Sequence, residues 1–104
     1  MKKELELYEL VFMLKFNLTD EQTSQKINEY RDFLTEKGSK VMVKLNGKRS
    51  LAYPIKGFDT ASYVQIVYLG NGTLVTELNK LIQRDEDVLR YITTKLPTHS
   101  LQEI

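Results

Sequence analysis

Residues 47–56 read Gly47-Lys48-Arg49-Ser50-Leu51-Ala52-Tyr53-Pro54-Ile55-Lys56. They combine three cations, a glycine hinge and a proline with apolar residues. The wider window, residues 37–58, holds six of the fifteen basic residues of the chain and none of its fourteen acidic residues. The window therefore carries +6 and the remainder −5, and such a local charge can bind a polyanion. On charge alone, a solvated lysine-rich hairpin without a ligand is the more ordinary interpretation.

The chain has 104 residues, 41% of them apolar, which predicts one folded domain with a modest core. We expect this domain to span residues 1–96 and a flexible tail to follow over residues 97–104. The absence of cysteine excludes disulfides and thiolate metal sites. Apolar runs are too short to span a bilayer, and the first residues lack the apolar segment of a signal peptide. The sequence thus predicts a soluble protein of the cytosol, or of an organelle that makes its own proteins, with no membrane partner.

Four segments alternate apolar and polar residues with the period of a β-strand. They are residues 5–16, residues 41–45 with a bend or bulge at Asn46-Gly47 and a continuation through residues 51–53, residues 62–69, and residues 88–95. The face of the first segment expected to meet the core carries Tyr8, Leu10, Phe12, Leu14 and Phe16. Pro54 has no amide hydrogen, so the second strand must end there or lie at an edge of the sheet. Residues 56–60 are expected to form a loop.

Two segments have apolar residues at helical spacing. The first opens with Thr19 and Gln22, which have the spacing of a capping box, and Gly38 is placed to end it. The second follows the turn residues 70–72, and Thr73 is expected to cap it. The residues expected to be buried are Ile27, Tyr30 and Leu34 in the first helix, and Leu74, Leu78 and either Leu81 or Ile82 in the second.

The order of elements is β-α-β-β-α-β, which predicts an α+β, ferredoxin-like split β-α-β fold with a four-stranded antiparallel sheet and two helices on one face. Between sheet and helices we expect Leu10, Phe12, Ile27, Val64 and Leu78. Two helices cover only one face of such a sheet. The open face is expected to display Val11, Met13, Tyr63, Gln65, Val67, Arg90, Ile92 and Thr94. So much apolar area on an open face is either tolerated exposure or a docking site.

Catalysis has little support in the sequence. His99 is the single histidine and lies in the predicted tail, which disfavours a catalytic triad, and no cluster has metal-ligand spacing. Asp85-Glu86-Asp87 is interpreted as a solvated turn before the last strand. Acylphosphatases share the predicted fold but need an arginine in a phosphate-binding loop after the first strand, and residues 15–19 contain neither arginine nor glycine. We therefore expect no enzyme activity, no cofactor, no metal and no small-molecule substrate.

RNA binding fits the residues better, through phosphates rather than bases. RNA-recognition-motif domains share the predicted topology and stack bases on aromatic residues of the two central strands. The corresponding open-face positions hold Val11, Met13, Gln65 and Val67, with Tyr63 only at a strand end. Contact with phosphates is instead expected from Lys48, Arg49 and Lys56. Arg49 can engage a phosphate with two hydrogen bonds, while the lysines act as point charges; the alternative for Arg49 is a surface ion pair.

The central stretch resembles a family signature. Gly47, Arg49, the run Leu51-Ala52-Tyr53-Pro54-Ile55 and Lys56 stand as they do in the sixth protein of the bacterial small ribosomal subunit. Further fragments agree in order: Tyr8-Glu9, Leu18-Thr19-Asp20-Glu21 and Asp85-Glu86-Asp87-Val88-Leu89-Arg90. The resemblance extends over residues 8–95, which is almost the whole chain.

This resemblance implies a structural protein of a bacterial or plastid small ribosomal subunit. Its implied partners are the central domain of small-subunit ribosomal RNA and the eighteenth small-subunit ribosomal protein. Lys48, Arg49 and Lys56 would then contact RNA. The expected partner-binding residues are Val11, Met13, Tyr63, Gln65, Val67, Arg90 and Ile92. The alternative from another class is a small-molecule-sensing regulatory domain of the same fold that homodimerises through its sheet.

Overall fold

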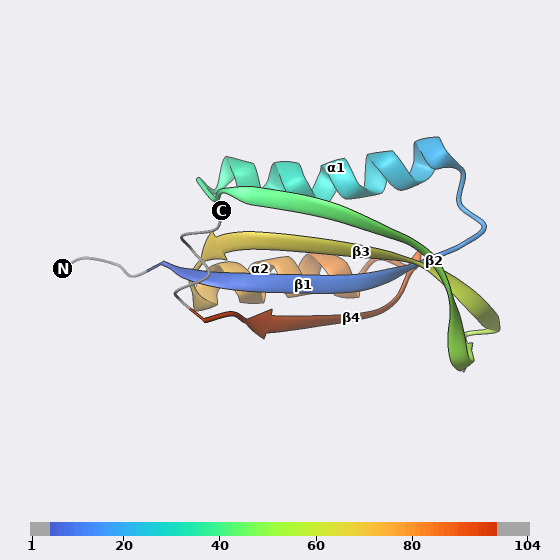
Figure 1. Cartoon of the computed structure of the whole chain (residues 1–104). Coiled ribbons are helices and arrows are strands. Elements are labelled where there is room, and N and C mark those ends of the chain that lie inside the picture. Colours follow the sequence, from blue (N-terminus) through green and yellow to red (C-terminus); the bar gives the residue numbers. More distant parts are fainter. Residues whose placement is uncertain (1–4, 98–104) are drawn as a thin grey trace.

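A computed structural model of the chain describes residues 5–97 and has the predicted order of elements (Figure 1). The elements are β1 (Glu6–Lys15), α1 (Asp20–Glu36), β2 (Val41–Ile55), β3 (Phe58–Gly70), α2 (Gly72–Gln83) and β4 (Val88–Lys95). Apart from Pro97, the predicted tail with His99 lies outside the described residues, and the domain boundary at residue 96 stays a prediction.

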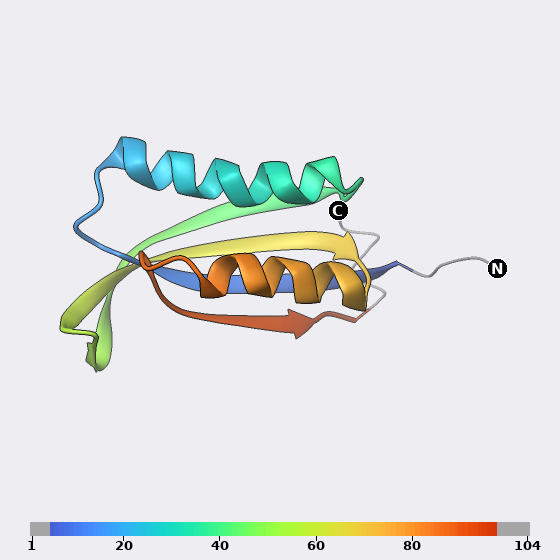
Figure 2. The same cartoon turned by 180° about the vertical axis from the view of Figure 1, so that it is seen from behind.

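The four strands form one antiparallel sheet in the order β2-β3-β1-β4. Both helices contribute to one core on one side of it, and Figure 2 shows α2 in front of the sheet with α1 running along its β2 side. The other side, seen in Figure 1, is open. The predicted ferredoxin-like α+β fold is confirmed.

The core lies where the alternation of the strands predicts. The five residues expected between sheet and helices are all buried: Leu10, Phe12, Ile27, Val64 and Leu78. Phe12 is fully buried and meets the ring of Tyr30 edge-to-face, with centroids 5.5 Å apart. In α2 the third buried position is Ile82, while Leu81 is only partly buried.

Helix α1 begins and ends as predicted. The Thr19 hydroxyl accepts a hydrogen bond from the Gln22 amide at 3.0 Å, and the Gln22 side chain accepts one from the Thr19 amide at 3.0 Å. At the other end Gly38 has a φ of 85° and donates its N–H to the carbonyl of Thr35 at 3.0 Å. Glycine reaches this left-handed conformation without strain, which is why it ends the helix.

Helix α2 begins two residues earlier than predicted, so Thr73 is not its cap. The cap is Asn71, whose side-chain oxygen accepts from the Leu74 amide at 3.0 Å, and the helix starts at Gly72. Asparagine and threonine are both good caps, but only one position can precede the first turn. The apolar face starting at Leu74 has to meet the core, and this sets the start of the helix.

Phe16 does not lie in the core, although it shares the strand parity of Phe12. Strand β1 ends at Lys15, whose amide donates to the carbonyl of Asp87 at 3.0 Å, and the chain then leaves the sheet. Phe16 is 39% exposed and packs on Phe58 instead. The alternation of side chains predicts which face of the sheet a residue lies on only within the strand itself, and Phe16 lies beyond its end.

The loop predicted over residues 56–60 is also wrong. Ile55 pairs with Phe58, so Lys56 and Gly57 alone make the turn between β2 and β3. Their φ values are 51° and 86°, and a two-residue turn of this kind needs positive φ at both positions. Gly57 adopts such a value without strain, and Lys56 is the one residue other than glycine in the described chain that does so.

The acidic run before β4 is a turn, but Asp85 is not solvated as predicted. Its side chain is 9% exposed and accepts hydrogen bonds from the Tyr30 hydroxyl and from Lys26 Nζ, the latter at 2.9 Å. Burial alone raises the pKa of Asp85, but the bonds from Tyr30, Lys26 and the Asp87 amide outweigh it and hold this pKa below its ordinary value. Lys26 also pairs with Asp87 at 3.1 Å, so the turn is tied to α1.

Replacing Phe12 with alanine is expected to lower the free energy of unfolding by roughly 3–5 kcal/mol, because a fully buried ring leaves a cavity. Such a loss is a large share of the stability of a small domain. Urea titration measures it, with Phe16→Ala as the matched control. The control is expected to cost about 1 kcal/mol or less, since that ring is partly in water already. Equal losses for the two variants would contradict the burial described here.

Replacing Asp85 with asparagine is expected to lower the free energy of unfolding by roughly 1–3 kcal/mol at neutral pH, because it removes the carboxylate that accepts from Lys26 and Tyr30. The folded pKa of Asp85 lies below the unfolded value near 3.8. Its stabilisation is therefore fully present above the unfolded pKa and is lost as the pH falls through the folded pKa.

Urea titrations of the wild type and Asp85→Asn over a pH series test this. The difference in the free energy of unfolding between the two proteins should disappear in acid. Glu86→Gln, which changes an exposed residue of the same turn, serves as the control. A difference in unfolding free energy that stays constant across the pH series would show that the charged form of Asp85 does not stabilise the fold.

Candidate nucleic-acid interface

The basic stretch forms the far end of the β2–β3 hairpin. Strand β1 pairs with β3 only from Ala61 onward, so residues 58–60 pair with β2 alone. Figure 1 shows this two-stranded end extending past the ends of β1 and β4. The register of β2 shifts between Leu45 and Gly47, as the predicted bulge requires, and Gly47 has a φ of 80°. The hairpin end thus projects from the sheet.

Residues 51–54, the apolar part of the stretch, bulge out of the ladder. Between the pairs Ser50–Thr60 and Ile55–Phe58, four residues of β2 face only one of β3. Pro54 lies in this bulge, where its missing amide hydrogen costs no ladder bond. Tyr53 is 60% exposed, and the bond between Tyr53 and Pro54 is trans. The bulge therefore presents an aromatic ring to solvent beside the cations.

The three predicted RNA-binding residues, Lys48, Arg49 and Lys56, are all exposed. None of them forms an ion pair with a carboxylate of residues 5–97. The alternative interpretation of Arg49 as one half of a surface ion pair is therefore not what the described residues show. Its guanidinium instead lies over the ring of Tyr63, with its carbon 5.6 Å from the ring centroid. Stacking of this kind leaves the N–H groups at the edge of the guanidinium available to an anion.

The predicted partner-binding residues lie on the sheet face opposite the helices. Strand pairing sets them in rows across the sheet: Lys44, Gln65, Val11 and Ile92 in one row, and Gly47, Tyr63, Met13 and Arg90 in the next. Val67 stands in a third row, beside Met42 and Glu9. Ile92 is 63% exposed and the central residues are partly exposed. This face is thus a mixed apolar and polar surface with cations at its borders.

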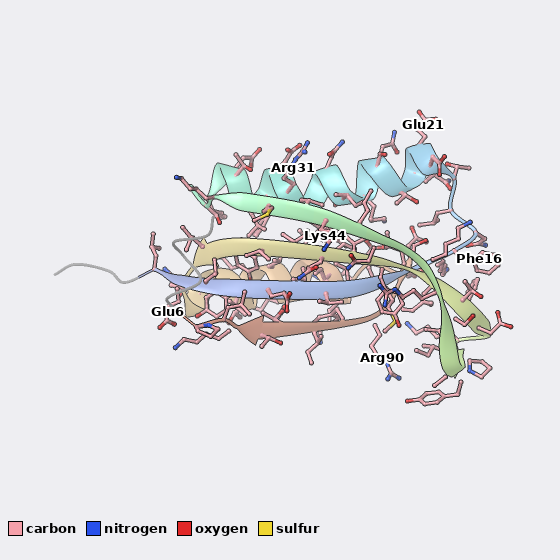
Figure 3. The ribbon with its side chains drawn as sticks, viewed as in Figure 1. Glu6, Phe16, Glu21, Arg31, Lys44 and Arg90 are labelled. Atoms are coloured by element: carbon pink, nitrogen blue, oxygen red, sulfur yellow. The ribbon has the colours of Figure 1, made fainter. Side chains whose placement is uncertain are left out.

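Three features of this region escaped the sequence analysis. Lys44 lies on the open face (Figure 3), where the alternation of β2 indicates it once the register is known. The second feature is the hydrogen bond that the Glu9 carboxylate, on the same face, accepts from the Gln65 amide. The third feature is the packing of Phe16 on Phe58 at the root of the hairpin, for which the sequence alone carries no signal, because it depends on the position of the turn.

The two predicted sets of residues are neighbours. Arg49 of the RNA set contacts Tyr63 of the partner set, and Lys56 lines the same shallow hollow as Arg90. The hollow also contains Asp85 and Glu86, so its charge is mixed. The hairpin and the open face therefore form one continuous surface with a basic end.

Other kinds of site find little support in the part of the chain that the structure describes. Within residues 5–97, His, Cys, Asp and Glu side chains do not gather in any group of three or more that would hold a metal ion. Over the same residues, neither helix is long and apolar enough to cross a membrane.

Comparisons with known sequences identify relatives over most of the chain. The family model described as Ribosomal protein S6 matches residues 7–95. The small ribosomal subunit protein bS6 of Rippkaea orientalis is 46% identical over 94 residues, which cover 89% of this chain and 76% of that protein. The small ribosomal subunit protein bS6c of Porphyra purpurea is 40% identical over 93 residues, which cover 88% of this chain and 83% of that protein.

A solved structure shares the fold. The crystal structure of the 30S ribosomal protein S6 from Thermotoga maritima superposes with a TM-score of 0.84, covering 96% of this chain and 94% of that chain. The two sequences are 22% identical, so this likeness supports the fold alone.

The match to the family model and the identity to relatives over most of their length agree with the signature in residues 47–56. The relatives are bacterial and plastid proteins, which confirms the predicted bacterial or plastid ribosomal setting. The chain belongs to the ribosomal protein S6 family and is a structural constituent of the small ribosomal subunit.

Proposed function

We propose that the hairpin binds phosphates of the central domain of small-subunit ribosomal RNA while the open sheet face binds the eighteenth small-subunit ribosomal protein. The RNA contacts are Lys48, Arg49 and Lys56. The protein contacts are Val11, Met13, Tyr63, Gln65, Val67, Arg90 and Ile92. The protein thus acts by joining RNA and a second protein within the subunit, without catalysing a reaction.

The observation that carries the proposal is the set of exposed cations on a projecting hairpin. Lys48, Arg49 and Lys56 have no carboxylate partner among residues 5–97, so their charge is not neutralised within the described chain. Cations of this kind bind phosphates and release counterions, which supplies most of the affinity of proteins for RNA backbones. The hairpin extends past the ends of β1 and β4, so an RNA strand can approach these residues at the end of the sheet.

The open face suits a protein more than RNA. Val11, Met13, Val67 and Ile92 offer apolar side chains, whereas aromatic residues suited to base stacking are limited to Tyr63, which Arg49 already covers. An apolar face rimmed by polar residues is typical of a protein-binding surface. The partner would also supply cations that this nearly neutral chain, with a net charge of +1, lacks.

The same apolar face is what a homodimerising regulatory domain would use, so the oligomeric state discriminates between the two functions. A regulatory homodimer has no need for unneutralised cations on the hairpin. The chain alone is therefore expected to be a monomer, which sedimentation at micromolar concentration measures.

The affinity of the chain for RNA should depend on the partner protein. The chain alone should bind a central-domain RNA fragment only weakly, because three cations neutralise few phosphates, and the partner protein should tighten binding. Filter retention of the labelled RNA, with and without saturating partner, measures the difference. Equal affinities in the two conditions, or a stable homodimer that binds no RNA, would contradict the proposal.

Single substitutions should separate the functions of the two surfaces. Arg49→Ala should weaken RNA binding and lower the slope of log affinity against log salt by about one unit, because one phosphate contact is lost. It should leave folding and partner binding nearly unchanged. Val67→Glu should do the reverse, weakening the heterodimer about tenfold or more, because an unpaired charge enters a docking face.

Two titrations on each variant give the result, one with the partner alone and one with RNA while the partner is held in excess. Lys40→Ala is the matched control for Arg49→Ala, because it removes an exposed charge next to the other end of β2. If Arg49→Ala abolishes the heterodimer, or if Val67→Glu leaves it untouched, this division between the surfaces is wrong.

A further inference from the structure

Two phenylalanine rings form a cluster outside the core that the proposed contacts do not use. Phe16 lies between β1 and α1 and is 39% exposed, and Phe58 is the first residue of β3. Their rings meet edge-to-face, with centroids 6.1 Å apart and an interplanar angle of 83°. Neither ring belongs to the buried core cluster. A pair of large rings at the surface has apolar faces that a ligand can cover.

A lysine ammonium group lies near each ring. Lys48 Nζ lies 5.9 Å from the centroid of Phe16, and Lys15 Nζ lies 5.9 Å from that of Phe58. We call these four residues the aromatic–lysine cluster. Lys48 has no carboxylate partner among residues 5–97, and the contact of Lys15 with Asp87 is long, at 3.8 Å. Each ring therefore has one ammonium group near it, while Asp87 lies near Lys15 and Asp59 follows Phe58 directly.

The cluster is continuous with the hairpin surface proposed to bind RNA. Lys48 belongs to both, since it is one of the three phosphate-binding cations and also lies over Phe16. Figure 3 shows Phe16 at the end of the molecule where the hairpin bends away from the sheet. An RNA strand held by Lys48 would therefore run within reach of the Phe16 ring.

We infer that the aromatic–lysine cluster binds one unpaired RNA base together with its adjacent phosphate. The base stacks on the ring of Phe16, which accepts any base because each offers a π-face. Lys48 shifts from the ring to the phosphate, which its flexible stem allows. This inference rests on the proposed RNA-binding function and adds to it a stacking contact, whereas the hairpin cations contact phosphates only.

The charge around the rings favours RNA over an apolar protein surface. A protein that covered Phe16 and Phe58 would have to take two ammonium groups out of water without neutralising them, which is costly. A nucleotide covers the ring with its base and neutralises an ammonium with its phosphate. The rings and the lysines thus match two parts of the same ligand.

The test compares two replacements of Phe16 in the full chain, with a central-domain RNA fragment as the probe. Phe16→Leu keeps an apolar contact with Phe58 but removes the stacking face. It is expected to weaken RNA binding about tenfold and to leave the salt slope unchanged, because no cation is lost. Phe16→Tyr keeps the ring and should bind as the wild type does. Leu5→Ala, which trims an exposed apolar residue just before β1, at the end of that strand opposite Phe16, should have no effect.

A purely structural role for Phe16 would give a different result. If the ring only orients the hairpin, Phe16→Leu would misplace the phosphate-binding cations and lower the salt slope along with the affinity. Photocrosslinking with a 4-thiouridine-substituted fragment adds a direct readout, and a crosslink at Phe16 or Phe58 is expected.

Three outcomes would overturn the inference while leaving the proposed function intact. They are an unchanged affinity for Phe16→Leu, a lowered salt slope for that variant, and crosslinks confined to other residues. Weakened binding of the partner protein with unchanged RNA binding would also overturn it, because the cluster would then belong to the protein interface. If the wild-type chain with its partner fails to bind the fragment at all, the proposed function fails first.

Discussion

Side chains of a β-strand point alternately to its two faces, and in this sheet helices cover only one of them. Burial of Leu10 and Phe12 therefore forces Val11 and Met13 to the open side, since a shift of one residue would exchange the faces. The continuous pairing of β1 with β3 joins the two sets in one rigid element. Stability and the exposure of the face proposed to bind the partner protein thus depend on the same register.

The segregation of charge along the chain becomes a segregation in space. Asp85 and Asp87 pair with Lys26 of α1, so these acids are paired within the folded unit. The cations of the hairpin, such as Arg49, have no such partner within the described residues. A nearly neutral protein can in this way keep a basic end, and the contact of Arg49 with Tyr63 joins that end to the open face.

Much of the fold was predictable from local patterns, because alternation, capping and glycine positions report on short-range physics. The capping box at Thr19 and the buried set around Phe12 are examples. The errors share a cause: the position of Phe16 and the turn at Lys56-Gly57 depend on where strands end, which long-range pairing decides. The burial of Asp85 could not be read from an acidic run either, since it requires Tyr30 and Lys26, which are distant in sequence, to lie beside it. For the site, residue types indicated the cations, but not the packing of Phe16 on Phe58.

Lysine acylation of intact small ribosomal subunits, followed by mass spectrometry, tests most directly whether the hairpin faces RNA. Lys48 and Lys56 should react far more slowly in the subunit than in the free chain, because phosphates cover them. Lys37 and Lys80, which are exposed at the helix side, should react alike in both states. Equal reactivity of Lys48 and Lys56 in subunit and free chain would contradict the assignment of the hairpin to RNA.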